Sequence, residues 1–191
     1  GDIGDYLVQS GLLEQQLLEQ IRAAAGTNGL YDLLLRTETL NHHQLTRTAS
    51  DFARLSLVSL FEWPNGTYEF YAGGHPSSEA LSLDALIYPL INEGIEELMD
   101  RQSITDFFSS YANPKLVRMR HRHLDLSNLL LSTRQLRIWN SIRSGQTVSE
   151  QVARLSSMPG IAEEQVYRTL FLMERLELLA LADEELNSAV N

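Results

Sequence analysis

The chain has 191 residues, no cysteine and a net charge of −10, with 15 lysines and arginines against 25 aspartates and glutamates. Without cysteine, it has no disulfide, thiolate metal ligand or cysteine nucleophile. The acidic excess argues against nucleic acids and anionic membranes as partners, because both carry negative charge. No apolar run approaches the roughly 20 residues that cross a bilayer. We therefore expect a cytoplasmic protein of one large or two small domains.

The charge is distributed unevenly along the chain. Residues 1–114 have a net charge of −11, residues 115–143 of +6, and residues 144–191 of −5. We call the middle segment, residues 115–143, the basic island, and expect it to steer an acidic partner. The alternative is that the island folds back on the acidic segments and neutralises them. The candidate partner-binding residues are Arg118, Arg120, Arg122, Arg134 and Arg137.

The first 62 residues have the apolar spacing of α-helices. Short helices are expected over 3–8, 14–25 and 30–36, followed by a long helix that Asn41 caps and that ends before Pro64. A weak repeat of 27 residues matches Leu7 with Leu34, Leu13 with Leu40, and Leu18 with Leu45. The repeat predicts two helical hairpins that bury one shared face. Chance matching in a leucine-rich sequence is the alternative.

The middle of the chain mixes turn, strand and helix signals. Residues 64–66 (Pro-Asn-Gly) predict a turn, and the alternating β-formers of 67–71 predict a strand. A helix is expected over 82–100, with a kink or break near Tyr88 because Pro89 lacks an amide hydrogen. A short helix over 103–110 and a strand from Lys115 should follow.

The last 65 residues predict three helices and a closing strand. Ser132 should cap a helix that runs to Arg143, followed by helices over 147–155 and 162–178 and a strand over 179–181. This layout is typical of a winged-helix-like unit. We therefore expect a mostly helical α+β fold, with domains over 1–125 and 126–191.

No constellation of residues predicts a catalytic, cofactor or metal site. His42 and His43 open a helix, where adjacent side chains diverge. His121 and His123 have the spacing of two ligands on one strand face, but the sequence indicates no third ligand. We therefore expect a protein that is not an enzyme and needs no cofactor.

Acidic residues lie on two predicted helices. Those of the 82–100 helix predict a solvated face and comprise Glu93, Glu96, Glu97 and Asp100. The 162–178 helix occupies the place of a DNA-recognition helix, yet it begins Ala-Glu-Glu-Gln. Two acids at that position repel phosphates, so nucleic acid is not the expected partner.

One segment resembles a known family. Residues Phe61-Glu-Trp63-Pro-Asn-Gly66-Thr-Tyr68-Glu-Phe70 resemble the closing signature of the PATAN domain, also called DUF4388, of bacterial signalling proteins. Residues 3–13, followed by Leu18, are similar to the helical insertion of that domain, and to the N-terminal helical repeats of type II secretion and type IV pilus ATPases. Residues 89–95 resemble the helix that follows the signature. A trailing winged-helix-like unit also occurs in some members.

The resemblance implies the organisation of the first domain. A helical insertion would span about 1–62 and the signature strand about 66–72, with Trp63, Tyr68 and Phe70 in the core. The family's domain opens with β-strands before the insertion, whereas this chain begins at the insertion. Either the sequence is part of a longer protein, or those strands come from elsewhere.

The resemblance also implies a function. PATAN proteins act as non-enzymatic adaptors in bacterial signal transduction, in motility, pilus, polarity or development control. The expected partner is a receiver domain, a small GTPase, or a polarity or pilus component, and a homo-oligomer is left open. One alternative is a transcription regulator that binds DNA through its C-terminal unit. Another is a cyclic-dinucleotide sensor, although the ATPase repeats use an arginine where Asp2 stands here.

Overall fold

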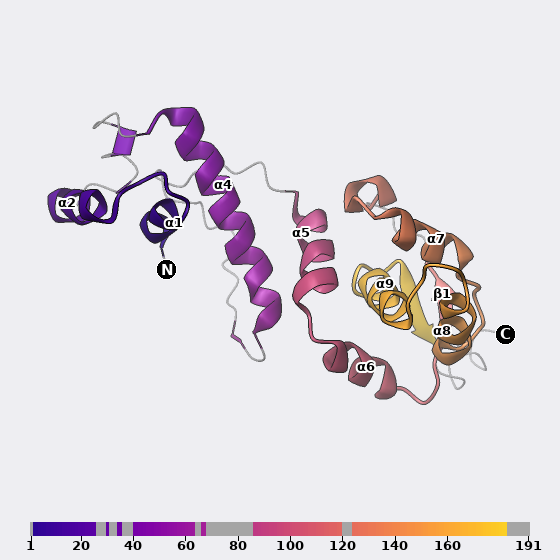
Figure 1. Cartoon of the computed structure of the whole chain (residues 1–191). Helices are drawn as coiled ribbons and strands as arrows, with labels where there is room; N and C mark the ends of the chain where they lie inside the picture. Colours follow the sequence, from indigo (N-terminus) through magenta and orange to yellow (C-terminus); the bar gives the residue numbers. More distant parts are fainter. Residues whose placement is uncertain are drawn as a thin grey trace, which may run out of the picture. The chain divides into compact units, whose positions relative to one another are not determined.

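The computed structural model describes residues 2–25, 30, 34–35, 40–63, 66–67, 86–119 and 124–182. It is a mostly helical α+β protein with a small antiparallel sheet, which confirms the predicted fold class (Figure 1). Among the helices within those ranges, none is both long and apolar enough to cross a membrane. The chain forms two compact units: residues 1–57 with 64–85, and residues 58–63 with 86–191.

The described part of the first unit consists mainly of α1 (Ile3–Gln9), α2 (Gln15–Ala25) and most of α4 (His42–Ser59). Asp2 caps α1 and accepts a hydrogen bond from the Asp5 amide at 3.0 Å. Arg22 of α2 donates to both carboxylates, at 2.6 Å to Asp2 and 2.9 Å to Asp5, and so ties the two helices together. Asn41 caps α4 as predicted, with its Oδ1 2.8 Å from the amide of Gln44.

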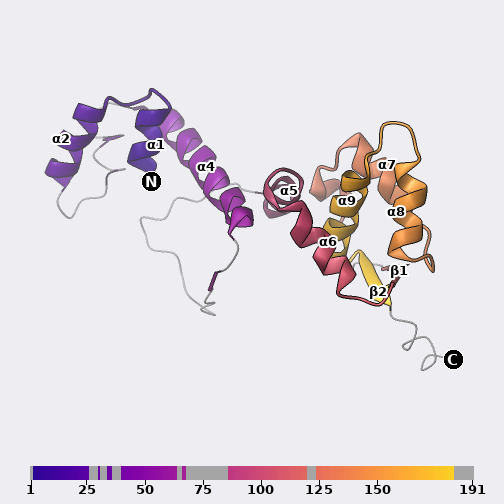
Figure 2. The ribbon, with the colours of Figure 1, turned by 60° about the horizontal axis from the view of Figure 1, so that its bottom comes forward.

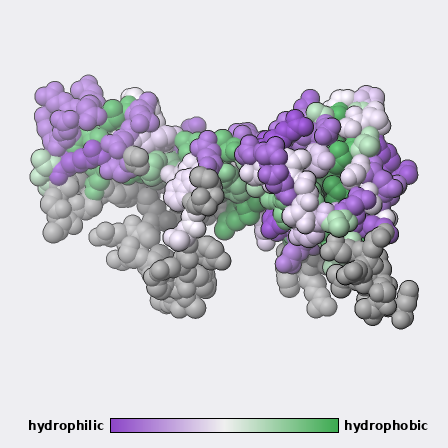
Figure 3. Space-filling model, turned by 90° about the horizontal axis from the view of Figure 1, so that it is seen from below, coloured by the Kyte–Doolittle hydropathy of each residue, from purple (hydrophilic) through white to green (hydrophobic). Residues whose placement is uncertain are grey.

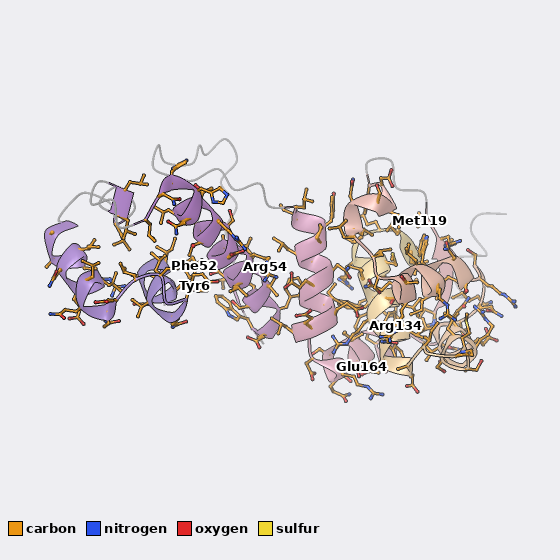
Figure 4. The ribbon with its side chains drawn as sticks, turned by 45° about the horizontal axis from the view of Figure 1, so that its top comes forward. Tyr6, Phe52, Arg54, Met119, Arg134 and Glu164 are labelled. Carbon is orange, nitrogen blue, oxygen red and sulfur yellow. The ribbon has the colours of Figure 1, made fainter. Side chains whose placement is uncertain are left out.

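The leucines of the 27-residue repeat form the core of the first unit. All three matched pairs are at most 5% exposed, and they belong to one hydrophobic cluster. The shared buried face expected from the repeat is therefore present among these residues. On the same unit, the rings of Tyr6 and Phe52 meet with their centroids 5.6 Å apart (Figure 4). The cluster comprises Leu7, Leu13, Leu18, Ile21, Leu34, Leu40 and Leu45.

The second unit begins with a 3₁₀ turn, η1 (Leu60–Glu62), and resumes with α5 (Ile87–Glu93) and a π-helix, η2 (Gly94–Leu98). Pro89 lies in the first turn of α5, where a missing amide hydrogen costs no helical bond. Helix α5 begins at Ile87, directly after the extended Leu86, and runs through Pro89; the part of the expected 82–100 helix before Leu86 lies outside the described residues. The ring of Phe61 packs directly against the backbone of Gly94. Helix α6 (Arg101–Ser109) follows.

A small sheet joins distant parts of the second unit. Strand β1 (Lys115–Arg118) pairs antiparallel with β2 (Leu179–Ala182), with Leu116 opposite Leu181. The other edge of β1 meets the segment before α8: the Leu116 amide donates to the Gln146 carbonyl at 2.9 Å, and the Gly145 amide to the Leu116 carbonyl at 2.8 Å. Strand β1 therefore lies between β2 and the segment that leads into α8.

The remaining helices confirm the predicted C-terminal order. They are α7 (Thr133–Ser141), α8 (Val148–Ser156) and α9 (Glu163–Arg175), with a short 3₁₀ helix, η3 (Leu126–Leu129), before them. The domain boundary expected at residue 125 would separate β1 from β2, whereas the compact units place residues 86–191 together. The physical reason is the strand pairing, together with packing of α6 on α9.

Helix α9 lies at the centre of the second unit. Both ribbon views show it among α6, α7 and α8 (Figures 1 and 2). Its buried residues are Val166, Thr169, Leu170, Phe171, Leu172 and Met173. They belong to one cluster with Leu116, Ile138 and Leu155. A helix buried on so many sides is a core element, and its exposed charges, Glu163 and Arg175, lie at its two ends.

The family-signature segment is only partly described. Tyr68 and Phe70, and with them most of the predicted 67–71 strand, lie outside the described residues, as do the 26–29 turn and the start of the 82–100 helix. Trp63 is described, and it is 62% exposed. The expectation that Trp63 is a core residue is therefore wrong. It follows η1 in an extended conformation, and Phe61, not Trp63, packs against the core cluster.

Candidate functional site

The structure describes three of the five candidate arginines. Arg118 ends β1, and Arg134 and Arg137 lie on α7. Arg120 and Arg122 fall outside the described residues. Figure 4 labels Arg134 on α7 and Met119, which follows β1. Within the described residues, the candidate arginines of the basic island therefore lie on α7 and at the end of β1.

Helix α7 holds its arginines in place through a strong N-terminal cap. Ser132 accepts a hydrogen bond from the Gln135 amide at 3.2 Å, and Gln135 Oε1 accepts one from the Ser132 amide at 2.8 Å. This reciprocal capping box satisfies two amides that the first helical turn leaves free. Gln135, Ile138 and Trp139 face the core. The opposite side of the helix therefore turns Arg134 and Arg137 to solvent.

Arg118 stabilises the packing of β1 on α7. Its guanidinium carbon lies 4.1 Å from the centre of the Trp139 ring, and its Nη2 donates to the Trp139 carbonyl at 2.7 Å. Burial lowers the pKa of this guanidinium, since the low-dielectric surroundings disfavour its charge. Arg118 is thus engaged within the fold, unlike the arginines on the outer side of α7.

The arginines of α7 and the loop after it have no acidic partner among the described residues. None of the ion pairs within those ranges includes Arg118, Arg134, Arg137 or Arg143. Arg137 makes only long contacts of 3.4 Å to the Pro159 carbonyl. Residues 126–149 also contain no aspartate or glutamate. Neutralisation by folding back, the alternative for the basic island, is therefore not seen for these four arginines.

A pocket of about 390 Å³ lies at the start of α7. Its lining comes from η2, α7, the cap before α7, and α9, and comprises Glu96, Ser132, Thr133, Arg134, Gln135, Ile138, Gln165 and Thr169. The volume lies within the range of roughly 300–1,000 Å³ that is usual for small-molecule sites. Two opposite charges, Glu96 and Arg134, face this one space.

A buried network of amides forms one side of the pocket. Gln135 Nε2 donates to Asn92 Oδ1 at 2.6 Å and to Glu96 Oε1 at 3.1 Å. Asn92 Nδ2 donates to the Leu129 carbonyl at 3.4 Å. Because Asn92 and Gln135 are at most 9% exposed, their hydrogen bonds hold α5, η2 and α7 in a defined arrangement.

Burial raises the pKa of the Glu96 carboxyl above its ordinary value of 4.5. The positive charge of Arg168 and the hydrogen bond from Gln135 oppose this shift but do not cancel it. Arg168 itself donates to Glu164 at 2.8 Å, to the Met99 carbonyl at 2.9 Å, and to the Ile95 carbonyl. Its hydrogen bonds therefore leave the Glu96 carboxyl available to the pocket.

Sequence reasoning placed Glu96 on a solvated acidic face, and this was wrong. The helix changes to π-helical geometry at Gly94, and Glu96 is half-buried beside Gln135. Wider winding changes which residues share a face, and single π turns are frequent at functional sites. Gly94 and the preceding Pro89 were the available signals, but neither predicts a π turn by itself.

Two of the five histidines lie within the described residues. His42 and His43 open α4, where adjacent side chains diverge. His75, His121 and His123 lie outside the described residues. Within the described part, no three histidines, aspartates or glutamates form a group that could hold a metal ion.

The face of α9 that would enter a DNA groove is covered. Phe171 packs on Phe107 of α6, with ring centroids 5.2 Å apart, and Tyr167 lies 5.8 Å from Phe108. Arg168 is bonded to the carbonyls at Ile95 and Met99, as described above. Aromatic packing and these bonds keep α6 and η2 against α9.

Comparison of the chain with protein-family models, with curated proteins and with solved structures finds no match.

Proposed function

We propose that this chain is a non-enzymatic protein-interaction module of bacterial signal transduction, and that it docks an acidic partner on the outer side of α7. The partner class implied by the PATAN resemblance is a receiver domain, a small GTPase, or a polarity or pilus component. The observation that carries the proposal is the set of arginines on and after α7 without acidic partners among the described residues.

The chemistry of this surface suits an acidic protein. Arg134, Arg137 and Arg143 provide three positive charges within ten residues, and Leu136, which is 39% exposed, adds an apolar contact between them. Arginine guanidinium groups bind carboxylates in bidentate fashion and lose little hydration in doing so. On the face seen in Figure 3, hydrophilic residues cover much of the second unit, with smaller apolar areas between them. A charged contact with a small apolar centre is typical of a transient interface.

A DNA-binding function is less well supported. A recognition helix must present a free polar face to the major groove. Here six residues of α9 are buried, and its Tyr167 and Arg168 contact α6 and η2. Its first turn carries Glu163 and Glu164, which repel phosphates. The transcription-regulator alternative would therefore need another surface.

The cyclic-dinucleotide alternative is also weakly supported. Asp2 stands near the position where the resembling ATPase repeats carry an arginine, and its carboxylate is already engaged by Arg22 and by the amide of Asp5. Two acidic residues at this end of α1 disfavour a phosphate. Isothermal titration with cyclic di-GMP should give no binding heat.

The docking proposal is tested by charge reversal. The full chain is used to capture a partner from bacterial extract, the partner is purified, and its affinity is measured for the wild type and for Arg134→Glu/Arg137→Glu. We expect a loss of at least about tenfold that shrinks as salt is added, because like charges then face each other.

The matched control is Arg101→Glu, which reverses an exposed arginine on α6 that makes, among the described residues, a long ion pair of 3.8 Å with Glu163. The control should retain wild-type affinity. Equal affinity of the double variant and the wild type for the purified partner would contradict the docking proposal. A gel shift with duplex DNA that the α7 reversal abolishes would favour the transcription regulator instead.

A further inference from the structure

The pocket at the start of α7 has features that the docking proposal does not use. It has a volume of about 390 Å³, and helices η2, α7 and α9 surround it. It also adjoins a π-helix and a half-buried carboxyl, two features that are enriched at functional sites. Its lining side chains define the ligand chemistry that it can bind.

The pocket offers one free positive group. The guanidinium of Arg134 forms no hydrogen bond or ion pair with any other residue that the structure describes. The hydroxyls of Ser132 and Thr133 line the same wall, at the N-terminus of α7. A carboxylate would receive charge-assisted hydrogen bonds from this side.

The pocket also offers one negative group. Glu96 Oε1 accepts a hydrogen bond from Gln135 at 3.1 Å, and no described residue donates to its second oxygen. Gln165 lines the pocket as well. Its Oε1 accepts from the Ala162 amide at 3.1 Å, which leaves its amide hydrogens for a ligand. An ammonium group would be bound well on this side, because its positive charge favours the ionised Glu96 carboxyl that burial disfavours.

We propose that this pocket binds a small zwitterion of the α-amino-acid class, with its carboxylate on Arg134 and its ammonium on Glu96. A simple anion would pair with Arg134 but face the carboxyl of Glu96. A simple amine would pair with Glu96 but face the guanidinium. Only a ligand that carries both charges pairs with both groups and meets no like charge in the pocket.

The proposal does not depend on the docking function. It requires Glu96, which lies away from the outer side of α7, whereas docking requires Arg137, which does not line the pocket. The variants Glu96→Gln and Arg137→Glu therefore separate the two. If the experiment contradicts one of the two proposals, the other still stands.

The test is a titration of the full chain with each of the twenty protein amino acids, followed by nuclear magnetic resonance of the backbone amides. At least one amino acid should shift the amides of η2 and of the first turn of α7 at concentrations up to about 10 mM. Its methyl ester, which lacks the carboxylate, and its N-acetyl derivative, which lacks the ammonium, should each bind about tenfold more weakly or worse.

Variants complete the test. Glu96→Gln and Arg134→Ala should each weaken binding of that amino acid about tenfold, while Arg143→Ala, an exposed arginine outside the pocket, should not change it. The derivative series needs no variant, so it decides the matter even if a substitution disturbs folding.

Three outcomes would overturn the proposal. The first is that no amino acid shifts amides near the pocket. The second is that the N-acetyl derivative or acetate binds as well as the amino acid, which would indicate a simple anion site on Arg134. The third is that the methyl ester binds as well, which would indicate a site for simple amines on Glu96.

Discussion

Gly94→Ala should destabilise the second unit through one defined clash. A Cβ atom at Gly94 would lie far inside contact distance of three ring carbons of Phe61. The ring would have to leave its place against the hydrophobic cluster of the unit. Overpacking of this kind costs about 1–3 kcal/mol. Alanine returns about 1 kcal/mol through its better helix propensity. We expect a net loss of up to about 2 kcal/mol in the free energy of unfolding.

The double variant makes the reasoning specific. In a Phe61→Ala background the clash is absent, so Gly94→Ala should be neutral or stabilise by up to about 1 kcal/mol. Urea unfolding followed by tryptophan fluorescence is the measurement. Both tryptophans, Trp63 and Trp139, belong to the second unit, so the signal reports that unit alone.

Gly145→Ala is the matched control. Gly145 has a φ of +86° and open space around its Cα, so alanine there costs backbone strain of about 1 kcal/mol without any clash. That cost should be equal with and without Phe61. If Gly94→Ala costs the same in both backgrounds, the clash with Phe61 is not its cause and the reasoning fails.

Three further predictions follow from the same unit. The free energy of unfolding of Glu96→Gln should rise relative to that of the wild type as pH increases above 4.5. The raised pKa means that the folded state holds its proton more tightly than the unfolded chain, so ionisation of Glu96 opposes folding; a difference in unfolding free energy that is constant from acid to neutral pH would contradict this. Arg118→Ala should cost about 1–2 kcal/mol through loss of the Trp139 contacts, whereas Arg137→Ala should change stability by less than about 0.5 kcal/mol; equal values in urea unfolding would show that Arg118 is not structural. Leu170→Ala should cost about 3–5 kcal/mol, because the side chain is fully buried at the centre of α9, and calorimetry should show the lowered melting temperature; a loss under about 1 kcal/mol would place α9 at the surface.

Caps and periodic leucines made much of the helical structure predictable. Asn41, Ser132 and Thr147 each cap a helix where the sequence indicated one, because a side-chain oxygen before an apolar run satisfies the first free amides. The leucines at 27-residue spacing are buried together because repeated helical hairpins place equivalent positions on one face.

The sequence predicted the arginines of the candidate site but not the pocket beside them. The arginines of α7 were evident from the charge distribution, and their exposure follows from the amphipathic pattern of that helix. That Arg118 is held on Trp139 could not be foreseen, since the two residues are 21 positions apart and meet only through the packing of β1 on α7. The pocket was missed because Glu96, Arg134 and Gln165 come from three different helices.

By itself, the sequence determined most helix positions, a strand beginning at Lys115 and another over 179–181, and the segregation of charge, because these depend on local propensity and on residue order. The tertiary structure decided which strand pairs with which, the burial of α9 on several sides, and the partial burial of Glu96 beside Gln135. Those features depend on contacts between residues tens of positions apart, for which a single sequence carries no local signal. The π turn at Gly94 lies between the two: the glycine is visible in the sequence, but only the ring of Phe61 against it explains why no larger residue fits.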